Sequence, residues 1–182
     1  MRHMANTHDP DDADAGVAWL APDEVRNWAA LMAVLEMLPS ALDAQLKRDA
    51  GLNHFEYMIL AGLSDAPEHT MGMTQLSLFA SGSLSRLSHA VGRLEAKGWV
   101  ARTPTGAGRS VEVSMTSEGR AMMERVAPGH VAEARRLVVD PLGPRRLAEL
   151  GRACRSMLDV IDPQVTAVID ATMDCVADGA TR

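Results

Sequence analysis

Hydrophobic residues recur at helical spacing in the middle of the chain. Four of them stand at i, i+3, i+7 and i+10 and so share one buried stripe of a helix: Leu84, Leu87, Val91 and Leu94. A shorter helix over residues 74–80 is expected before it. Ser81 is the expected N-cap of the longer helix, and Gly82 favours a tight turn. The pattern therefore predicts two short helices joined by a tight turn.

The opposite face of the longer helix is polar and basic. At about 100° per residue it carries four side chains and no carboxylate: Ser85, Arg86, His89 and Arg93. We call these four residues the reading face. Guanidinium groups can fork onto guanine or phosphates, while hydroxyl and imidazole groups reach base edges or backbone. The reading face therefore indicates contact with DNA.

Alternating residues after the helix predict two strands. Gly98 suits a left-handed C-cap, and residues 99–102 and 110–114 then follow the period of two that is typical of strands. The loop between them is rich in Pro and Gly and is tipped by Arg109. Two helices followed by such a hairpin make a winged helix-turn-helix. Its second helix enters a major groove, and the Arg at the wing tip reaches the neighbouring minor groove or the backbone.

The order and spacing of these motifs resemble the MarR (multiple antibiotic resistance regulator) family. The residues that carry the resemblance are Gly51-Leu52, Glu56-Tyr57, Leu60, Leu84-Ser85-Arg86, Arg93-Leu94-Glu95, Gly98-Trp99-Val100, Arg102, Arg109 and Thr116-Ser117-Glu118-Gly119. The resemblance runs from about Trp19 to about Asp162. It implies a homodimeric, ligand-responsive regulator, usually a repressor, with Arg86 and Arg93 on the reading helix and Arg109 on the wing. One departure is Ala107, where the family usually has an Asp that fixes the wing Arg.

The expected DNA contacts come from both helices and from the wing. They are Thr74, Gln75, Ser83, Ser85, Arg86, His89, Arg93, Arg109 and Ser110. A two-fold dimer would read a palindromic, double-stranded DNA operator. The expected fold is mostly α with a small β-hairpin wing, and the N- and C-terminal helices form the dimer.

Four segments are expected along the chain. They are an acidic tail (1–17), a first helix for dimerisation and a pocket wall (18–50), the DNA-binding domain (51–115) and C-terminal dimerisation helices (116–182). Pro39 should kink or split the first helix. A long helix from Thr116 to about Val139 should bend at Pro128-Gly129, and residues 140–144 are expected as a connector.

The C-terminal part carries an apolar stripe that needs a cover. Six residues continue at helical spacing after the connector: Leu147, Leu150, Cys154, Met157, Leu158 and Ile161. Asp162 and Pro163 then suit the start of a further helix. This last helix either takes part in dimerisation or folds back on its own subunit, and the sequence leaves both alternatives open.

Composition and charge agree with a helical DNA-binding subunit. Hydrophobic residues make up 47% of 182 residues and aromatic residues only 3%, so the core relies on Ala, Leu, Val and 12 Met. The net charge of −6 is polarised, because residues 81–109 carry five basic side chains against Glu95 alone. The acidic tail is expected to be solvated, with an autoinhibitory DNA mimic as the alternative. No run of 18 apolar residues and no secretory signal occurs, so a cytoplasmic, nucleoid-associated protein is expected.

An effector cavity is expected beside the DNA-binding domain over residues 51–115, which we call the reading head. Residues that could line it are Trp28, Met32, Leu35, Met58, Met122, Met123 and Val126, with His54 and His130 near its edge. The alternative to an effector cavity is that these residues simply pack in the core. In MarR-like proteins a small, often phenolic effector binds in such a cleft, and the resemblance implies that binding changes the spacing of the two recognition helices.

Other functions have weaker support. The chain has no phosphate-binding glycine loop, no GxSxG, no HExxH and no paired Cys/His set, so no enzyme, cofactor or metal site is expected. Cys154 and Cys175 lie far from the start of the first helix, where the peroxide-sensing branch of the family has its reactive Cys. The alternative function is a winged-helix protein-interaction module with weak or lost DNA binding.

Overall fold

The computed structural model describes residues 17–105 and 110–170. The elements in chain order are α1 (Pro22–Ala50), α2 (His54–Asp65), the 3-10 turn η1 (Pro67–His69), β1 (Thr70–Gly72), α3 (Met73–Phe79), α4 (Leu84–Ala96), β2 (Val100–Thr105), β3 (Ser110–Met115), α5 (Ser117–Ala134), the π-helix η2 (Arg135–Val139) and α6 (Asp140–Ile161). The chain divides into two compact units, residues 1–37 and residues 38–182. The mostly helical class with a small β-hairpin is as expected.

The first unit contributes the N-terminal part of α1. Pro22 and the acidic first turn favour the start of this helix. α1 is one continuous helix through Pro39, so the expected split at Pro39 is wrong. A proline removes a single backbone hydrogen bond, and a helix can tolerate that loss where other turns remain intact. Among the described helices, α1 is also long and apolar enough to cross a membrane by length and composition, a test that core helices pass as well.

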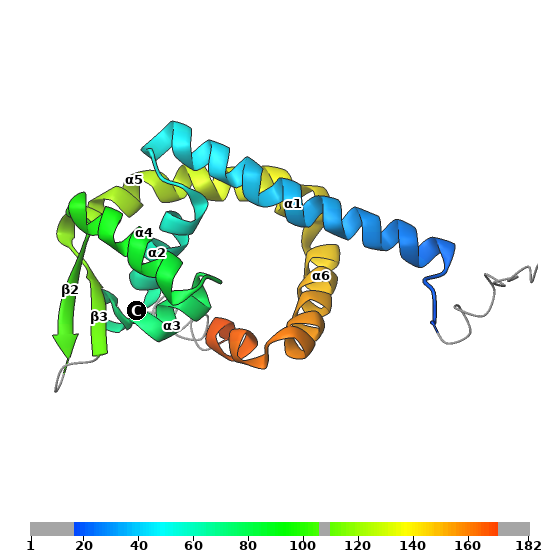
Figure 1. Ribbon diagram of the computed structural model, residues 1–182. Helices are drawn as coiled ribbons and strands as arrows, with labels where there is room; N and C mark the ends of the chain where they lie inside the picture. The colour runs from blue at the N-terminus through cyan, green and yellow to red at the C-terminus, as the bar shows by residue number, and fades with distance from the viewer. Residues whose placement is uncertain (1–16, 106–109, 171–182) are drawn as a thin grey trace, which may run out of the picture. The chain divides into compact units, whose positions relative to one another are not determined.

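The core of the second unit lies under the predicted helix-turn-helix. It gathers apolar side chains from the end of α1 and from α2, α3, α4, the sheet and α5. The completely buried large residues are Leu46, Leu52, Ile59, Leu60, Leu63, Leu76, Leu87, Leu94, Val91 and Val113. Figure 1 shows α4 beside the β2–β3 hairpin, with α2 and α3 packed next to it. The Leu and Val residues expected from composition therefore supply most of the completely buried core.

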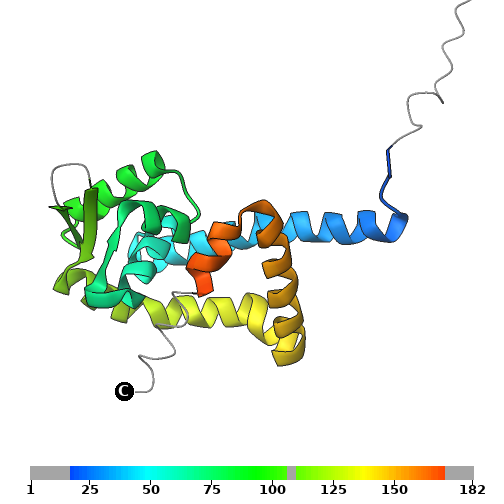
Figure 2. The same ribbon diagram turned by 90° about the horizontal axis from the view of Figure 1, so that it is seen from below.

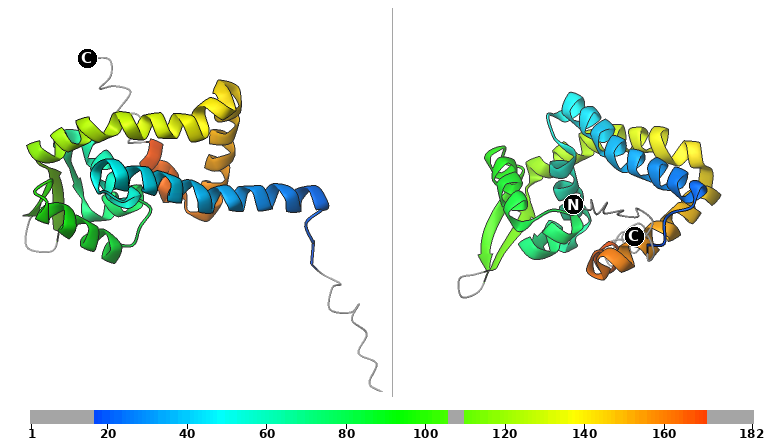
Figure 3. Two further views of the ribbon diagram at one scale, coloured as in Figure 1. Left: turned by 90° about the horizontal axis from the view of Figure 1, so that it is seen from above. Right: turned by 45° about the vertical axis from the view of Figure 1, so that its right-hand side comes forward.

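The sheet has three antiparallel strands in the order β1-β3-β2. β2 and β3 are the two expected strands, and their register pairs Arg102 with Val113 and Thr105 with Ser110. Pro104 is accommodated because β2 is an edge strand. β1 was not expected from the sequence, since three residues are too short to show a period of two. The hairpin projects beyond the helices of the head (Figure 3).

The C-terminal helices depart from the expected geometry. α5 passes through Pro128 and ends at Ala134, and the irregular backbone lies further on, in η2. The expected connector at 140–144 is counted within α6, but Gly143 breaks the helical geometry with a φ of 66°. The chain then changes direction between α5 and α6 (Figure 2). A helical segment over residues 163–170 follows, as the Asp-Pro signal predicted.

That last segment contacts α6. The Asp162 carboxylate accepts a hydrogen bond from the backbone N–H of Gln164 at 3.0 Å, as an N-cap does. Arg155 on α6 forms an ion pair with Asp170 at 3.3 Å. The segment therefore folds back on its own α6, at least as far as residue 170.

Candidate nucleic-acid interface

The apolar stripe of α4 docks this helix on the core. Leu87, Val91 and Leu94 are completely buried, together with Ala90. The fourth residue of the predicted stripe, Leu84, is 52% exposed, which corrects the expectation that it is buried. Leu84 is the first residue of α4 and follows the turn directly, so its side chain lies at the margin of the head. The buried stripe fixes which face of α4 points outward.

Ser83, and not Ser81, caps α4. The backbone of Ser83 is extended, and its hydroxyl accepts a hydrogen bond from the N–H of Arg86 at 3.2 Å. Ser81 has a φ of 52° and lies in the turn, where its N–H donates to the carbonyl of Leu78. The N-cap of α4 therefore lies two residues later than expected. The close packing of Gly82 against Phe55 explains the small residue there, because a Cβ would lie 2.5 Å from the ring.

The reading face is exposed as expected. Ser85, Arg86, His89 and Arg93 all lie on the outer side of α4, and no carboxylate interrupts them. Thr74 and Gln75 are exposed at the start of α3. Arg109, Ala107 and the side chain of Ser110 lie outside the described residues. The helix-turn-helix part of the predicted contact set is therefore exposed to solvent.

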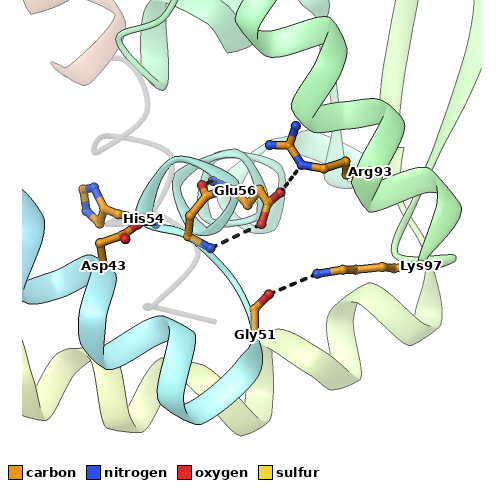
Figure 4. Close-up of polar contacts among 7 residues, drawn as sticks. Asp43, Gly51, His54, Glu56, Arg93 and Lys97 are labelled. Carbon is orange, nitrogen blue, oxygen red and sulfur yellow. Dashed lines mark hydrogen bonds and ion pairs between the residues drawn. The ribbon is translucent and has the colours of Figure 1, made fainter.

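Arg93 is held by a carboxylate that is not among the DNA contacts expected from the sequence. The Nε of Arg93 donates to Oε1 of Glu56 at 2.7 Å, and the Glu56 side chain is only 5% exposed (Figure 4). Glu56 also closes a capping box with Asn53 at the start of α2. The Asn-x-x-Glu spacing could have been recognised as a capping box in the sequence. Its partner Arg93 lies 37 residues later, and only the fold brings the two together.

The other basic residues of the head also have partners. The Arg86 guanidinium lies over the Phe55 ring, 4.0 Å from its centroid. Lys97 donates to the carbonyl of Gly51 at 3.2 Å and lies over Trp99. Arg102 on β2 donates to the carbonyl of Ser88 at 2.6 Å, and it also lies 3.5 Å from Glu95. Arg102 therefore ties the hairpin to α4.

A cleft of about 640 Å³ opens beside the reading face. Its apolar wall includes Phe55, Met58 and Phe79, and its polar rim includes His54, Asp43 and three residues of α4: Arg86, His89 and Arg93. A second cleft of about 520 Å³ lies between the end of α1 and α5.

The two clefts separate the expected effector residues of the second unit. Met58 lines the first cleft, whereas Met122 and Val126 line the second and are almost completely buried. Trp28 is exposed and Met32 is partly buried in the first unit, which is described by itself. Met58 and Met122 therefore do not share one cavity.

A pair of histidines lies beside the first cleft, which His54 lines. His54 and His130 are 5.9 Å apart between ring centroids, and His130 packs on Tyr57 at 4.1 Å. His130 Nδ1 lies 3.2 Å from the Gln45 amide oxygen. Burial lowers the pKa of His54, against the attraction of the Asp43 carboxylate, and burial with the nearby His54 lowers the pKa of His130. Both rings therefore favour the neutral state in the folded protein. Among the described residues, no group of three or more His, Cys, Asp or Glu side chains is arranged to hold a metal ion.

Comparisons with known proteins identify the family. No model of a known protein family and no curated protein matches the chain. Sco3205, a MarR family transcriptional regulator of Streptomyces coelicolor solved in complex with DNA, is 38% identical over 80% of this chain and 95% of its own, with a TM-score of 0.77. AbsC, a MarR family regulator of the same organism, is 32% identical over 80% of this chain and 98% of its own, with a TM-score of 0.75.

A more distant structure shares the fold alone. CouR of Rhodococcus jostii RHA1, solved bound to p-coumaroyl-CoA, is 21% identical over 74% of this chain and 90% of its own, with a TM-score of 0.61. The two Streptomyces regulators carry the family assignment, because both are more than 30% identical and are matched over nearly their whole length. The chain belongs to the MarR family of winged-helix, DNA-binding transcriptional regulators.

Proposed function

We propose that this protein is a homodimeric repressor that binds an inverted-repeat operator through α4 and releases it when a small effector binds. The observation that carries the proposal is the exposed reading face, which has no acidic residue among its own four side chains, on a helix whose opposite side is buried in the core. Half-sites are expected roughly one helical turn apart, about 10–11 bp centre to centre, because each copy presents one α4 to the major groove.

The homodimer is supported by apolar surface that a single chain leaves open. No residue of α6 is buried within the described part of one chain, although the helix carries the predicted apolar stripe. Val160 is 86% exposed and Ile161 77% exposed at its end. On α1, Trp28, Val34 and Leu35 are also more than half exposed. Large apolar patches of this kind mark interaction surfaces, and a second copy is the partner we propose.

The operator proposal is tested by fluorescence anisotropy. The protein is titrated against labelled DNA from upstream of its own gene and against a scrambled duplex, at two salt concentrations. Selective binding to the upstream DNA, with affinity that falls as salt rises, is the expected result. Equal, weak binding to both duplexes would contradict an autoregulating operator reader and would favour a winged helix that works through protein contacts.

The sign of regulation is tested by transcription in vitro. Protein added to a template that carries the bound operator is expected to reduce the transcript, since the operator complex would block polymerase. An increased transcript would contradict the repressor assignment while leaving operator binding intact.

We place the effector in the cleft beside the reading face. Its apolar wall suits an aromatic ring, and its cationic rim suits an anionic group. A ligand there would contact Arg86 and Arg93, which the DNA also needs. CouR, which shares the fold, was crystallised with p-coumaroyl-CoA. These features support a phenolic or other aromatic anion as the effector.

Two methionine variants test which cleft is used. p-Coumarate is titrated into the operator complex, and release of DNA is followed by anisotropy. Met58→Ala should raise the p-coumarate concentration needed for half release severalfold, because Met58 lines the first cleft. The control Met122→Ala alters the wall of the second cleft and should leave that concentration unchanged. If Met122→Ala and not Met58→Ala raises this concentration, the effector binds in the second cleft. If p-coumarate releases no DNA at any concentration, this ligand class is rejected.

A further inference from the structure

Glu56 is a buried carboxylate at the edge of the reading head. Its Oε2 accepts a hydrogen bond from the N–H of Asn53 at 3.2 Å, and its Oε1 accepts one from Arg93 at 2.7 Å. The capping box needs a Glu or Gln at this position, but it does not need a negative charge. Burying an unpaired carboxylate costs free energy, so the charge of Glu56 favours the ion pair with Arg93. The pair holds the Arg93 side chain beside Glu56.

The contact with Glu56 leaves one edge of the Arg93 guanidinium open. Glu56 takes the Nε, and the two terminal nitrogens point away from the carboxylate (Figure 4). The Arg93 side chain is still 55% exposed. The edge formed by the two terminal nitrogens can donate two parallel hydrogen bonds to the O6 and N7 acceptors of guanine. A guanidinium fixed at Nε keeps this edge in one orientation, whereas a free one can swing to any nearby phosphate oxygen.

The charge of Glu56 acts on DNA in a second way. A carboxylate next to the reading face repels phosphates, and it weakens contacts that depend on charge alone. The base contact of Arg93 depends on geometry and suffers less. Discrimination between sequences improves when the binding of wrong sequences is penalised.

We propose that Glu56 is a positioning residue for DNA reading, which makes Arg93 a base reader and prevents it from acting as a general phosphate clamp. The inference rests on the proposed function, in which α4 reads an operator. It adds a residue of α2 that does not itself face the DNA but determines how selectively α4 binds.

The test compares four proteins: wild type, Glu56→Gln, Arg93→Ala and the double variant. The ratio of dissociation constants for scrambled and operator DNA is measured for each. Gln keeps the capping box and an acceptor for Arg93 but removes the charge. We expect E56Q to lower the ratio about three- to tenfold, the discrimination of a weakened bidentate base contact, mainly through tighter binding to scrambled DNA. In the Arg93→Ala background the same change should alter the ratio less than about twofold, since coupled residues are non-additive.

A matched control separates position from charge. Glu112 is an exposed carboxylate on β3, and it forms no ion pair with Arg93 or Arg102 among the described residues. Glu112→Gln removes one negative charge and should change binding to both duplexes equally, so its ratio stays at the wild-type value.

The outcomes distinguish this inference from the proposed function. If the wild-type protein does not prefer its operator, the proposed function fails. If the wild-type protein prefers its operator but E56Q has the wild-type ratio, the role of Glu56 is overturned. The role is also overturned if the Glu56→Gln change lowers the ratio by the same factor in the wild-type and Arg93→Ala backgrounds. Thermal melting verifies folding. If E56Q melts at a lower temperature than wild type, Glu56→Asp replaces it in the test. Asp keeps the charge but is one methylene shorter and cannot reach Arg93, so this variant must also lower the ratio. An unchanged ratio in Glu56→Asp overturns the proposal.

Discussion

At the scale of single residues, three basic side chains in the described part of the head have partners within the protein. Arg86 lies over Phe55, Arg93 is paired with Glu56, and Arg102 is bonded to α4. Helical periodicity identified which side chains face outward, because that depends only on spacing. It could not identify what they touch, because Phe55 and Glu56 reach α4 only through the packing of α2. The contacts that the sequence did not reveal therefore join residues that are far apart along the chain.

Replacing either arginine of the reading face tests its role. Arg93→Ala or Arg86→Ala should cost about 1–3 kcal/mol of operator binding if that residue reads a base, and should relax the preference at one base position. Binding to a panel of single-base operator variants measures this. Equal losses on operator and random DNA would instead make the residue a phosphate contact.

Arg109 is expected to act through charge alone. Arg109→Ala should weaken binding to all sequences and reduce the slope of log affinity against log salt by roughly one unit, because one phosphate contact is lost. Titrations at four salt concentrations give the slope. An unchanged slope would mean that this residue, which lies outside the described part of the chain, does not touch the backbone of DNA.

The histidine pair makes stability depend on pH. Burial lowers the pKa of both His54 and His130 below the ordinary value of 6.5, so the unfolded chain binds protons first as the pH falls. The free energy of unfolding should be highest above about pH 6.5, and should decline as the pH falls from there through the lower folded-state pKa values. Urea midpoints at pH 7.5 and 5.5 measure the decline.

A substitution tests whether the histidine pair causes the decline in stability at low pH. His130→Asn should reduce the difference between the two urea midpoints, whatever it does to the midpoint at pH 7.5. His89→Asn, a change on the exposed face of α4, serves as the control and should leave the difference as in wild type. A His130→Asn protein with the full wild-type difference would assign the pH dependence to other groups.

At the scale of elements, local signals placed the helices well and their ends less well. The capping residues of α2 and α5 and the hairpin strands follow from short motifs in the sequence. The shift from Ser81 to Ser83 arose because the turn backbone satisfies its own hydrogen bonds. β1 exists only because β3 offers it an edge, which no pattern within Thr70–Gly72 encodes. Pairing partners decide such short elements, and the sequence of the element alone does not.

The junction between β2 and α5 depends on a glycine in the first turn of α5. A Cβ at Gly119 would lie 2.1 Å from the backbone oxygen of Trp99, so the chain itself would have to move. Thr116 holds the junction with hydrogen bonds from Gly119 N–H (3.0 Å) and to the Gly98 carbonyl (2.7 Å). Gly119→Ala should lower the free energy of unfolding by about 1–3 kcal/mol, the usual cost of overpacking.

Urea denaturation checks this value against a second glycine. Gly92 lies inside α4, and a Cβ there would meet only the end of the Arg102 side chain at 3.9 Å. Gly92→Ala should leave stability unchanged or raise it by up to about 1 kcal/mol, because alanine favours helices over glycine. Similar losses in both variants would show that the contact at Trp99 is not the cause.

At the scale of the whole molecule, the sequence predicted the fold class and the exposure of the reading face, whereas the assembly depends on a second copy. The apolar stripe of α6 was recognisable from its spacing, and in a single copy it remains uncovered. The segment after Asp162 partly resolves the two alternatives for the chain end, since its ion pair with Arg155 places residues 163–170 against their own subunit. Whether a second copy covers the stripe of α6 depends on how two chains pair.

Truncation tests whether this segment supports the dimer. Deleting residues 163–182 should convert a dimer to a monomer if the segment lies in the interface or braces α6 for it. Light scattering after size-exclusion chromatography gives the mass. Deleting residues 1–16 is the control and should leave a dimer. A dimer that survives the C-terminal deletion would assign the interface to α1 and α6 alone.

Arg102 joins β2 to the middle of α4 through the Ser88 carbonyl and Glu95, and we expect the hairpin and the helix to move together. A rigid piece that enters two neighbouring grooves sets the distance between them, and the duplex must bend or narrow to match. Pyrimidine–purine steps yield to such deformation more easily than stiff A-tracts. Dissociation constants for duplexes that differ only at uncontacted steps would measure this cost. Base pairs that no side chain touches should then influence affinity through their stiffness, and natural target sites should be selected for flexibility as well as for sequence.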